Sequence, residues 1–143
     1  MRVCLDTNVL VRLFGTRPQF AAIKHALLTG GLDLAVSNEV LLEYEEVIVR
    51  LSGRDRWRQI EELFEKLAAL HGNIVRVAPQ FRFQVIANDP DDNKFVDCAI
   101  AAQADFVVTS DAAFIALRNA GYKPQPIGPD EFIAQHLPSI SPP

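Results

Sequence analysis

The spacing of hydrophobic residues along the chain predicts short strands that alternate with helices. Strands are indicated by compact apolar runs such as 3–5 and 106–109, whereas helices carry apolar residues three or four positions apart, as in 38–51. Because parallel neighbours need long crossover connections, the alternation predicts an α/β fold built on a parallel sheet. The predicted strands are 3–5, 32–36, 74–77, 106–109 and 126–127, and the predicted helices are 9–14, 18–30, 38–51, 57–70, 94–103, 112–120 and 129–137.

The length and composition predict one domain. The chain has 143 residues, of which 49% are hydrophobic, so it can bury a sizeable core but has no room for a second domain. We assign the domain to residues 1–137 and expect the tail 138–143 to be loose. No apolar run approaches the length of a membrane span, and the start of the chain does not resemble a signal peptide, so we expect a cytoplasmic protein.

The overall charge limits the partners. A formal net charge of -4 and a sequence pI near 5.3 argue against broad, charge-driven binding to nucleic acid. Any polyanionic partner would therefore need local basic residues or bound cations.

The soft-metal ligands are not arranged for zinc. Cys4 and Cys98 lie in apolar surroundings at a spacing that matches no zinc motif, which predicts reduced core thiols. The histidines, at positions 25, 71 and 136, are scattered along the chain.

Carboxylates are concentrated where the strands end. Asp6 directly follows the first strand, and Asp111 follows the strand 106–109; carboxyl ends of parallel strands meet at one edge of the sheet. Asp97 interrupts an apolar helix, where an unpaired acid is costly. Since clustered carboxylates repel unless a cation bridges them, we expect Mg²⁺ or Mn²⁺ at this edge. The competing structural interpretation is helix capping for Asp6 and Asp111 and a solvated helix face for Glu43.

Four motifs in order resemble the PIN domain family. They are L-D-T-N-V-L from Leu5, S-x5-E from Ser37 to Glu43, D-x2-I-A-A from Asp97, and V-T-S-D ending at Asp111. The stretch DPDDNKFVDCAIAAQADFVVTSD is similar to PIN proteins that are toxin components of bacterial toxin–antitoxin systems. The resemblance covers nearly the whole chain.

This resemblance implies a single-domain α/β/α sandwich with a central, mainly parallel sheet, and a metal-dependent ribonuclease, most simply an endoribonuclease. The products would carry 5′-phosphate and 3′-hydroxyl ends, and single-stranded RNA is the expected substrate. An antitoxin protein and a second copy of the chain, in a homodimer, are the expected partners. The implied catalytic and metal-binding acids are Asp6, Glu43, Asp97 and Asp111, with Asp92 as a fifth ligand, and the supporting polar residues are Asn8, Ser37 and Thr109.

A basic segment offers a candidate contact for RNA or a partner chain. RLSGRDRWR, at 50–58, contains Arg54, Arg56 and Arg58 beside Trp57. The alternative is a solvated helix turn with Trp57 in the core.

Two other function classes fit parts of the pattern. A haloacid-dehalogenase-type phosphohydrolase also begins with a strand ending in aspartate, and Lys94 could stand in for the lysine of that family. The motif of that family, however, needs a second aspartate two residues after the first, where this chain has Asn8. A non-catalytic PIN-like module that binds RNA or protein would be free to lose acids, whereas this chain keeps every acid that maps to the family's motifs.

Overall fold

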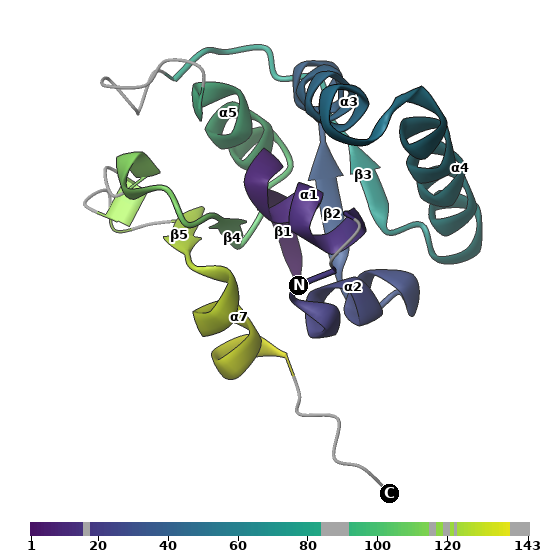
Figure 1. The fold of residues 1–143 in the computed structure, drawn as a ribbon. Helices are drawn as coiled ribbons and strands as arrows, with labels where there is room; N and C mark the ends of the chain where they lie inside the picture. The colour runs from purple at the N-terminus through teal and green to yellow at the C-terminus, as the bar shows by residue number, and fades with distance from the viewer. Residues whose placement is uncertain (16–17, 84–91, 115–116, 119–120, 122, 138–143) are drawn as a thin grey trace, which may run out of the picture.

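The chain forms a five-stranded sheet in which every neighbouring pair is parallel (Figure 1). The computed structural model describes residues 1–15, 18–83, 92–114, 117–118, 121 and 123–137. The strand order is β3-β2-β1-β4-β5, so the first strand lies at the centre. The strands are β1 (Arg2–Leu5), β2 (Asp33–Val36), β3 (Ile74–Arg76), β4 (Phe106–Val108) and β5 (Gln125–Ile127).

Helices flank this sheet and connect its strands. Helix α5 packs against β1, β2 and β4, while α3 and α4 lie side by side and α1 packs on α3 (Figure 1). The predicted α/β class with a parallel sheet is therefore confirmed. The helices are α1 (Thr7–Phe14), α2 (Ala21–Leu28), α3 (Asn38–Ser52), α4 (Arg54–His71), α5 (Asn93–Ala101) and α7 (Pro129–His136), with a 3₁₀ turn η2 (Ala112–Phe114).

The predicted helix at 112–120 is confirmed only in part. The segment begins with the short turn η2, in which Phe114 N–H donates to Asp111 O at 3.2 Å, and the described residues 117–118 are helical. Such i→i+3 bonding is tighter than an α-helix and suits short pieces. Positions 115–116 and 119–120 lie outside the described residues, as do 84–91 and the tail 138–143.

The core is continuous from the sheet to the helices. Trp57 of α4 is 3% exposed, and Cys4 and Cys98 are buried free thiols, as predicted. Asn73, just before β3, is buried and donates from Nδ2 to the carbonyls of Leu27 and Leu32, at 2.9 Å each. This amide ties the end of α2 and the start of β2 to β3.

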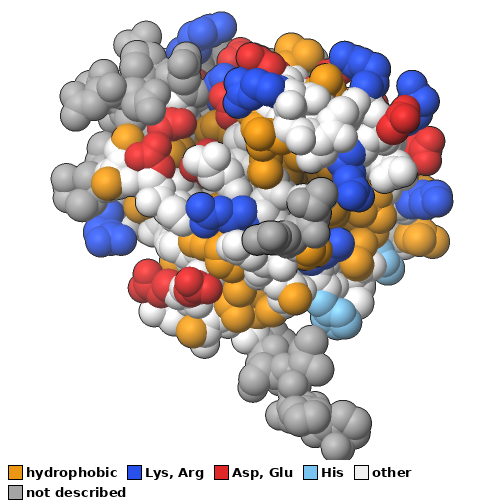
Figure 2. Space-filling model, in the orientation of Figure 1, with side chains coloured by type: hydrophobic (Ala, Val, Ile, Leu, Met, Phe, Trp, Pro, Cys, Tyr) orange, Lys and Arg blue, Asp and Glu red, His pale blue; other side chains and the backbone are white. Residues whose placement is uncertain are grey.

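The surface carries mixed charge. Figure 2 shows Lys and Arg side chains scattered among acidic ones on the face in view, without one continuous basic patch. This distribution agrees with the net charge of -4. Among the described residues, no helix is both long enough and apolar enough to cross a membrane.

Candidate active site

Three buried polar residues directly follow the carboxyl ends of the central strands. Asp6 follows β1, Ser37 follows β2 and Thr109 follows β4, and each is only 4–5% exposed. Leu5 pairs with Val108, and Asp6 N–H donates to Val108 O at 3.0 Å. The strand register therefore brings residues from distant parts of the chain to one edge.

Asp6 is the most deeply buried acid at this edge. Burial raises the pKa of its carboxyl group, while hydrogen bonds from Thr109 and from the Thr7 backbone lower it. The negative charges of Glu43 and Asp111 raise the pKa of Asp6 further. Asp6 is thus close enough to be repelled by both of these carboxylates, and a bound cation would relieve that repulsion.

Glu43 reaches this edge from α3. The Tyr44 phenol donates to Leu5 O, which fixes the rotation of α3 against β1. The Thr7 hydroxyl donates to Glu43 Oε2, and Lys94 Nζ lies 2.9 Å from Glu43 Oε1. With its side chain 23% exposed and held by two partners, Glu43 does not belong to a freely solvated helix face.

Asp111 is exposed but locally fixed. Its backbone N–H donates to Thr109 Oγ1 at 3.0 Å, and its Oδ1 accepts from Ala113 N–H at 2.9 Å. The hydrogen bond from Ala113 N–H is the capping contact that the sequence analysis gave as the competing interpretation of Asp111.

Asp97 faces a different group of residues. Its Oδ1 accepts a 3.0 Å hydrogen bond from Phe83 N–H, and burial raises its pKa while this bond lowers it. Glu39 raises the pKa of Asp97 and Arg82 lowers it. A cavity of about 90 Å³ lies here, and Lys94, which pairs with Glu43, also lines it. Lys94 therefore connects the surroundings of Asp97 with Glu43.

The remaining predicted site residues lie around these acids. Asn8 is exposed in the first turn of α1, and Ser37 caps α3 by accepting from Val40 N–H at 3.2 Å. Asp92 is half-buried at the N-cap of α5.

The three predicted arginine contacts lie in the first turns of α4. Arg54 pairs with Glu45 at 3.2 Å, and Arg58 pairs with Asp55 at 3.6 Å, while Arg56 is half-buried. Both guanidinium groups are largely exposed, at 64% each, so these ion pairs are weak and the arginines can exchange partners.

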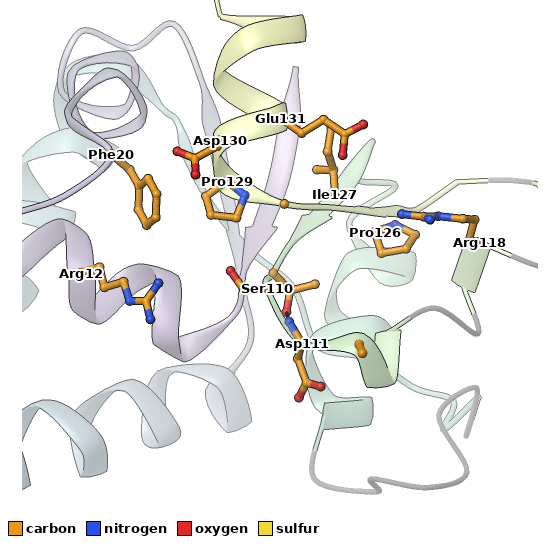
Figure 3. A pocket seen from close by; sticks show the side chains of 13 residues that line it. Arg12, Phe20, Ser110, Asp111, Arg118, Pro126, Ile127, Pro129, Asp130 and Glu131 are labelled. Carbon is orange, nitrogen blue, oxygen red and sulfur yellow. Dashed lines mark hydrogen bonds between the residues drawn. The ribbon is translucent and has the colours of Figure 1, made fainter.

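Sequence reasoning missed an open cavity of about 500 Å³ beside Asp111. Figure 3 shows Arg12 of α1 and Arg118 on opposite sides of it, with Phe20 near Arg12. Arg12 is four positions after Asn8, and both are exposed, so a helical-face analysis of α1 could have identified it.

The donor set has the chemistry of a hard divalent cation site, because it consists of carboxylate and hydroxyl oxygens with excess negative charge. Within the described segments, no three His, Cys, Asp or Glu side chains are arranged to hold an ion. Lys94 instead supplies the positive charge next to Glu43. Binding of an ion through Glu43 therefore competes with this ammonium group.

Comparisons with known proteins agree with the motifs. A family model described as PIN domain matches residues 2–113. A search of curated proteins found no significant match.

Several solved structures share the fold. FitAcB from Neisseria gonorrhoeae is 19% identical, with 89% of this chain and 97% of that chain covered at a TM-score of 0.55. VapBC2 from Rickettsia felis, bound to a DNA fragment from its promoter, is 17% identical, with 90% of this chain and 98% of that chain covered at a TM-score of 0.56. VapBC-1 from nontypeable Haemophilus influenzae is 17% identical, with 91% and 99% covered at a TM-score of 0.54. At these identities the likeness concerns the fold alone.

Proposed function

The chain belongs to the PIN domain family, and from this premise we propose that it is a divalent-metal-dependent ribonuclease that cleaves RNA internally. The observation that carries the proposal is the meeting of acids at the carboxyl edge of the sheet, where the buried Asp6, 5% exposed, lies close to the negative charges of Glu43 and Asp111. Such a group favours a bound cation at the edge of the sheet.

We propose that Asp6, Glu43, Asp97 and Asp111 would hold Mg²⁺ or Mn²⁺, with Asp92 as a fifth ligand. To do so, Glu43 would exchange Lys94, and Asp97 would exchange Phe83 N–H, for the ion. A bound divalent cation would supply Lewis-acid activation of water and stabilise the negative charge on the departing 3′ oxygen. The expected products therefore end in 5′-phosphate and 3′-hydroxyl groups.

The polar residues around the acids orient them. Thr109 donates to Asp6 and accepts from Asp111 N–H, so one hydroxyl sets the position of both residues. Thr7 donates to Glu43 and thereby holds its carboxylate towards α1. Ser37 caps α3 and so fixes the helix that carries Glu43. Asn8 is exposed beside these groups, where its amide can donate to a phosphate oxygen.

The cavity beside Asp111 offers contacts for the substrate. Arg12 and Arg118 line it together with Asp130 and Glu131, and the two guanidinium groups can bind the phosphates of single-stranded RNA. Arg54, Arg56 and Arg58 are assigned to more distant RNA or to a partner chain.

We further propose that the enzyme acts in the cytoplasm as the toxin of a toxin–antitoxin pair and forms a homodimer. Support comes from the similar folds of FitAcB and the VapBC assemblies, of which VapBC2 is a complex with promoter DNA. Co-expression with the protein encoded beside it, followed by growth measurement, tests the toxin role separately from the cleavage chemistry.

A non-catalytic binding module is the second candidate, because Lys94 already neutralises one of the acids by pairing with Glu43. Cleavage of 5′-labelled single-stranded RNA by purified protein distinguishes the two. A nuclease cuts in Mg²⁺ or Mn²⁺, stops in EDTA, resumes on metal addition and leaves 5′-phosphate ends. A binding module retains the RNA uncut under all of these conditions.

A further inference from the structure

Two aromatic side chains are unusually exposed after β3. Phe81 is 71% exposed and Phe83 is 47% exposed, and their ring centroids are 6.3 Å apart at an interplanar angle of 55°. Arg82 lies between them in sequence, with its side chain 80% exposed. Phenylalanine is usually buried, so a pair of exposed rings beside a cation indicates a binding surface.

This segment is attached to one of the proposed catalytic acids. Phe83 N–H donates to Asp97 Oδ1 at 3.0 Å. Phe81 and Arg82 line the same small cavity as Asp97 and Lys94. The rings therefore lie at the rim of the proposed site.

Arg82 is held only weakly by its neighbour. Its Nη2 lies 3.6 Å from Glu39 Oε1, and both side chains are largely exposed. Exposed pairs of this kind contribute little, so a phosphate can replace the Glu39 carboxylate as the partner of Arg82.

We propose that Phe81, Arg82 and Phe83 form a stacking platform for the bases of single-stranded RNA whose backbone approaches Asp97. The proposal rests on the proposed nuclease function and adds to it how the substrate is held. Aromatic faces accept any base, and Arg82 supplies the charge that an anionic chain needs beside an acidic site. Bases in a duplex are already stacked, so the platform selects unpaired RNA. The arginine between the rings favours nucleic acid over a purely apolar protein partner.

The test measures binding without cleavage. Fluorescence anisotropy gives the Kd of the Asp6→Asn protein for a single-stranded RNA and for the same RNA with abasic sites. The double variant Phe81→Ala/Phe83→Ala is compared in that background with Phe81→Tyr/Phe83→Tyr, which keeps the rings. Leu70→Ala is the matched control, because Leu70 is 75% exposed on α4 and lies outside the proposed site.

The platform predicts that the alanine pair binds intact RNA roughly 5- to 150-fold more weakly, the range for loss of one stacked base. The tyrosine pair and Leu70→Ala should bind like the parent, and the alanine pair should no longer distinguish intact from abasic RNA. The platform is overturned if the alanine pair binds intact RNA with an unchanged Kd. It is also overturned if the alanine substitutions weaken binding to abasic RNA as much as binding to intact RNA. A third result would also overturn it. If the alanine pair sediments as a monomer where the parent is a dimer, and its affinity for RNA is retained, the rings contact a second copy of the chain.

Wild-type cleavage separates the two proposals. If wild-type protein cuts RNA and the alanine pair binds normally, the platform is wrong and the nuclease stands. If wild-type protein does not cut but base-dependent binding needs the rings, the platform stands and the nuclease proposal is wrong.

Discussion

Thr109 Oγ1 donates a 2.8 Å hydrogen bond to Asp6 Oδ2, although the two residues are 103 positions apart in the chain. They meet because β1 and β4 are parallel neighbours with Leu5 paired to Val108. The same hydroxyl accepts from Asp111 N–H at 3.0 Å. A single side chain thus positions two of the proposed catalytic acids.

Replacing Thr109 by Val should disturb both acids with little change in shape. The hydrogen bond from Thr109 lowers the pKa of Asp6, so its loss raises that pKa further. The acid limb of the pH–rate profile should therefore move to higher pH, and the free energy of unfolding should fall by about 1–3 kcal/mol. Thr109→Ser keeps the hydroxyl and should behave like wild type; identical profiles for the Val and Ser variants would contradict this role.

Metal binding should stabilise the protein in a pH-dependent way. Burial raises the pKa of Asp6, so the ionised form is disfavoured in the folded state and metal-free stability should decline as pH rises through that raised pKa. Mn²⁺ binds the ionised form, so its effect on Tm should be largest at neutral pH and vanish as pH falls through the pKa of Asp6. At 100-fold excess over Kd the gain is about 2.7 kcal/mol.

Thermal unfolding with and without Mn²⁺, from pH 8 down to the ordinary aspartate pKa of 3.8, checks this expectation. Asp6→Asn should abolish the shift, whereas Asp55→Asn, a change at an exposed acid of α4, should retain it. A metal shift that is the same at every pH, or that survives in Asp6→Asn, is incompatible with the assigned ligand.

Lys94 should compete with the cation for Glu43. Its Nζ lies 2.9 Å from Glu43 Oε1, and both side chains are only about one-fifth exposed, at 22% and 23%. Lys94→Met removes the competing charge and should tighten Mn²⁺ binding by about five-fold, measured by calorimetry. Lys66→Met, on the exposed face of α4, is the control. Weaker binding in Lys94→Met would mean that the lysine helps to position Glu43.

The fold itself depends on Asn73. Its amide donates 2.9 Å hydrogen bonds to two carbonyl groups, of Leu27 and Leu32, and the residue is 1% exposed. Asn73→Ala leaves both acceptors without this donor and should lower the free energy of unfolding by about 2–4 kcal/mol in urea titration. Gln59→Ala, at an exposed position of α4, should change it little. If Asn73→Ala lowers the free energy of unfolding no more than Gln59→Ala does, the anchoring role is contradicted.

The sequence predicted the strands well because their apolar runs are short and bounded by polar residues. The same reasoning predicted that Asp6 and Asp111 lie at one edge, since it needs only that the strands are parallel. Helix starts were less well predicted: α4 begins at Arg54, three residues before the first apolar residue Trp57. The first turn is polar and exposed, so it carries no apolar periodicity.

Contacts between distant residues could not be predicted from local patterns. Lys94 and Glu43 are 51 positions apart in the chain, and Phe83 and Asp97 are 14 positions apart. The exposure of Phe81 and Phe83 was also hidden, because the sequence alone does not distinguish a surface phenylalanine from a core one. Only the Phe-Arg-Phe alternation, in a segment without a helical pattern, could have pointed to it.

The most direct test of the central claim compares cleavage rates of single-stranded RNA among charge-removing variants of the acids. We predict that Asp6→Asn, Glu43→Gln, Asp97→Asn and Asp111→Asn each lose at least about 100-fold in rate, as expected for groups that act as one unit with bound metal. Glu62→Gln, at an exposed acid of α4 that lies outside the proposed site, should retain wild-type activity. Wild-type rates in the four site variants, with the fold intact, would contradict a carboxylate-based nuclease site.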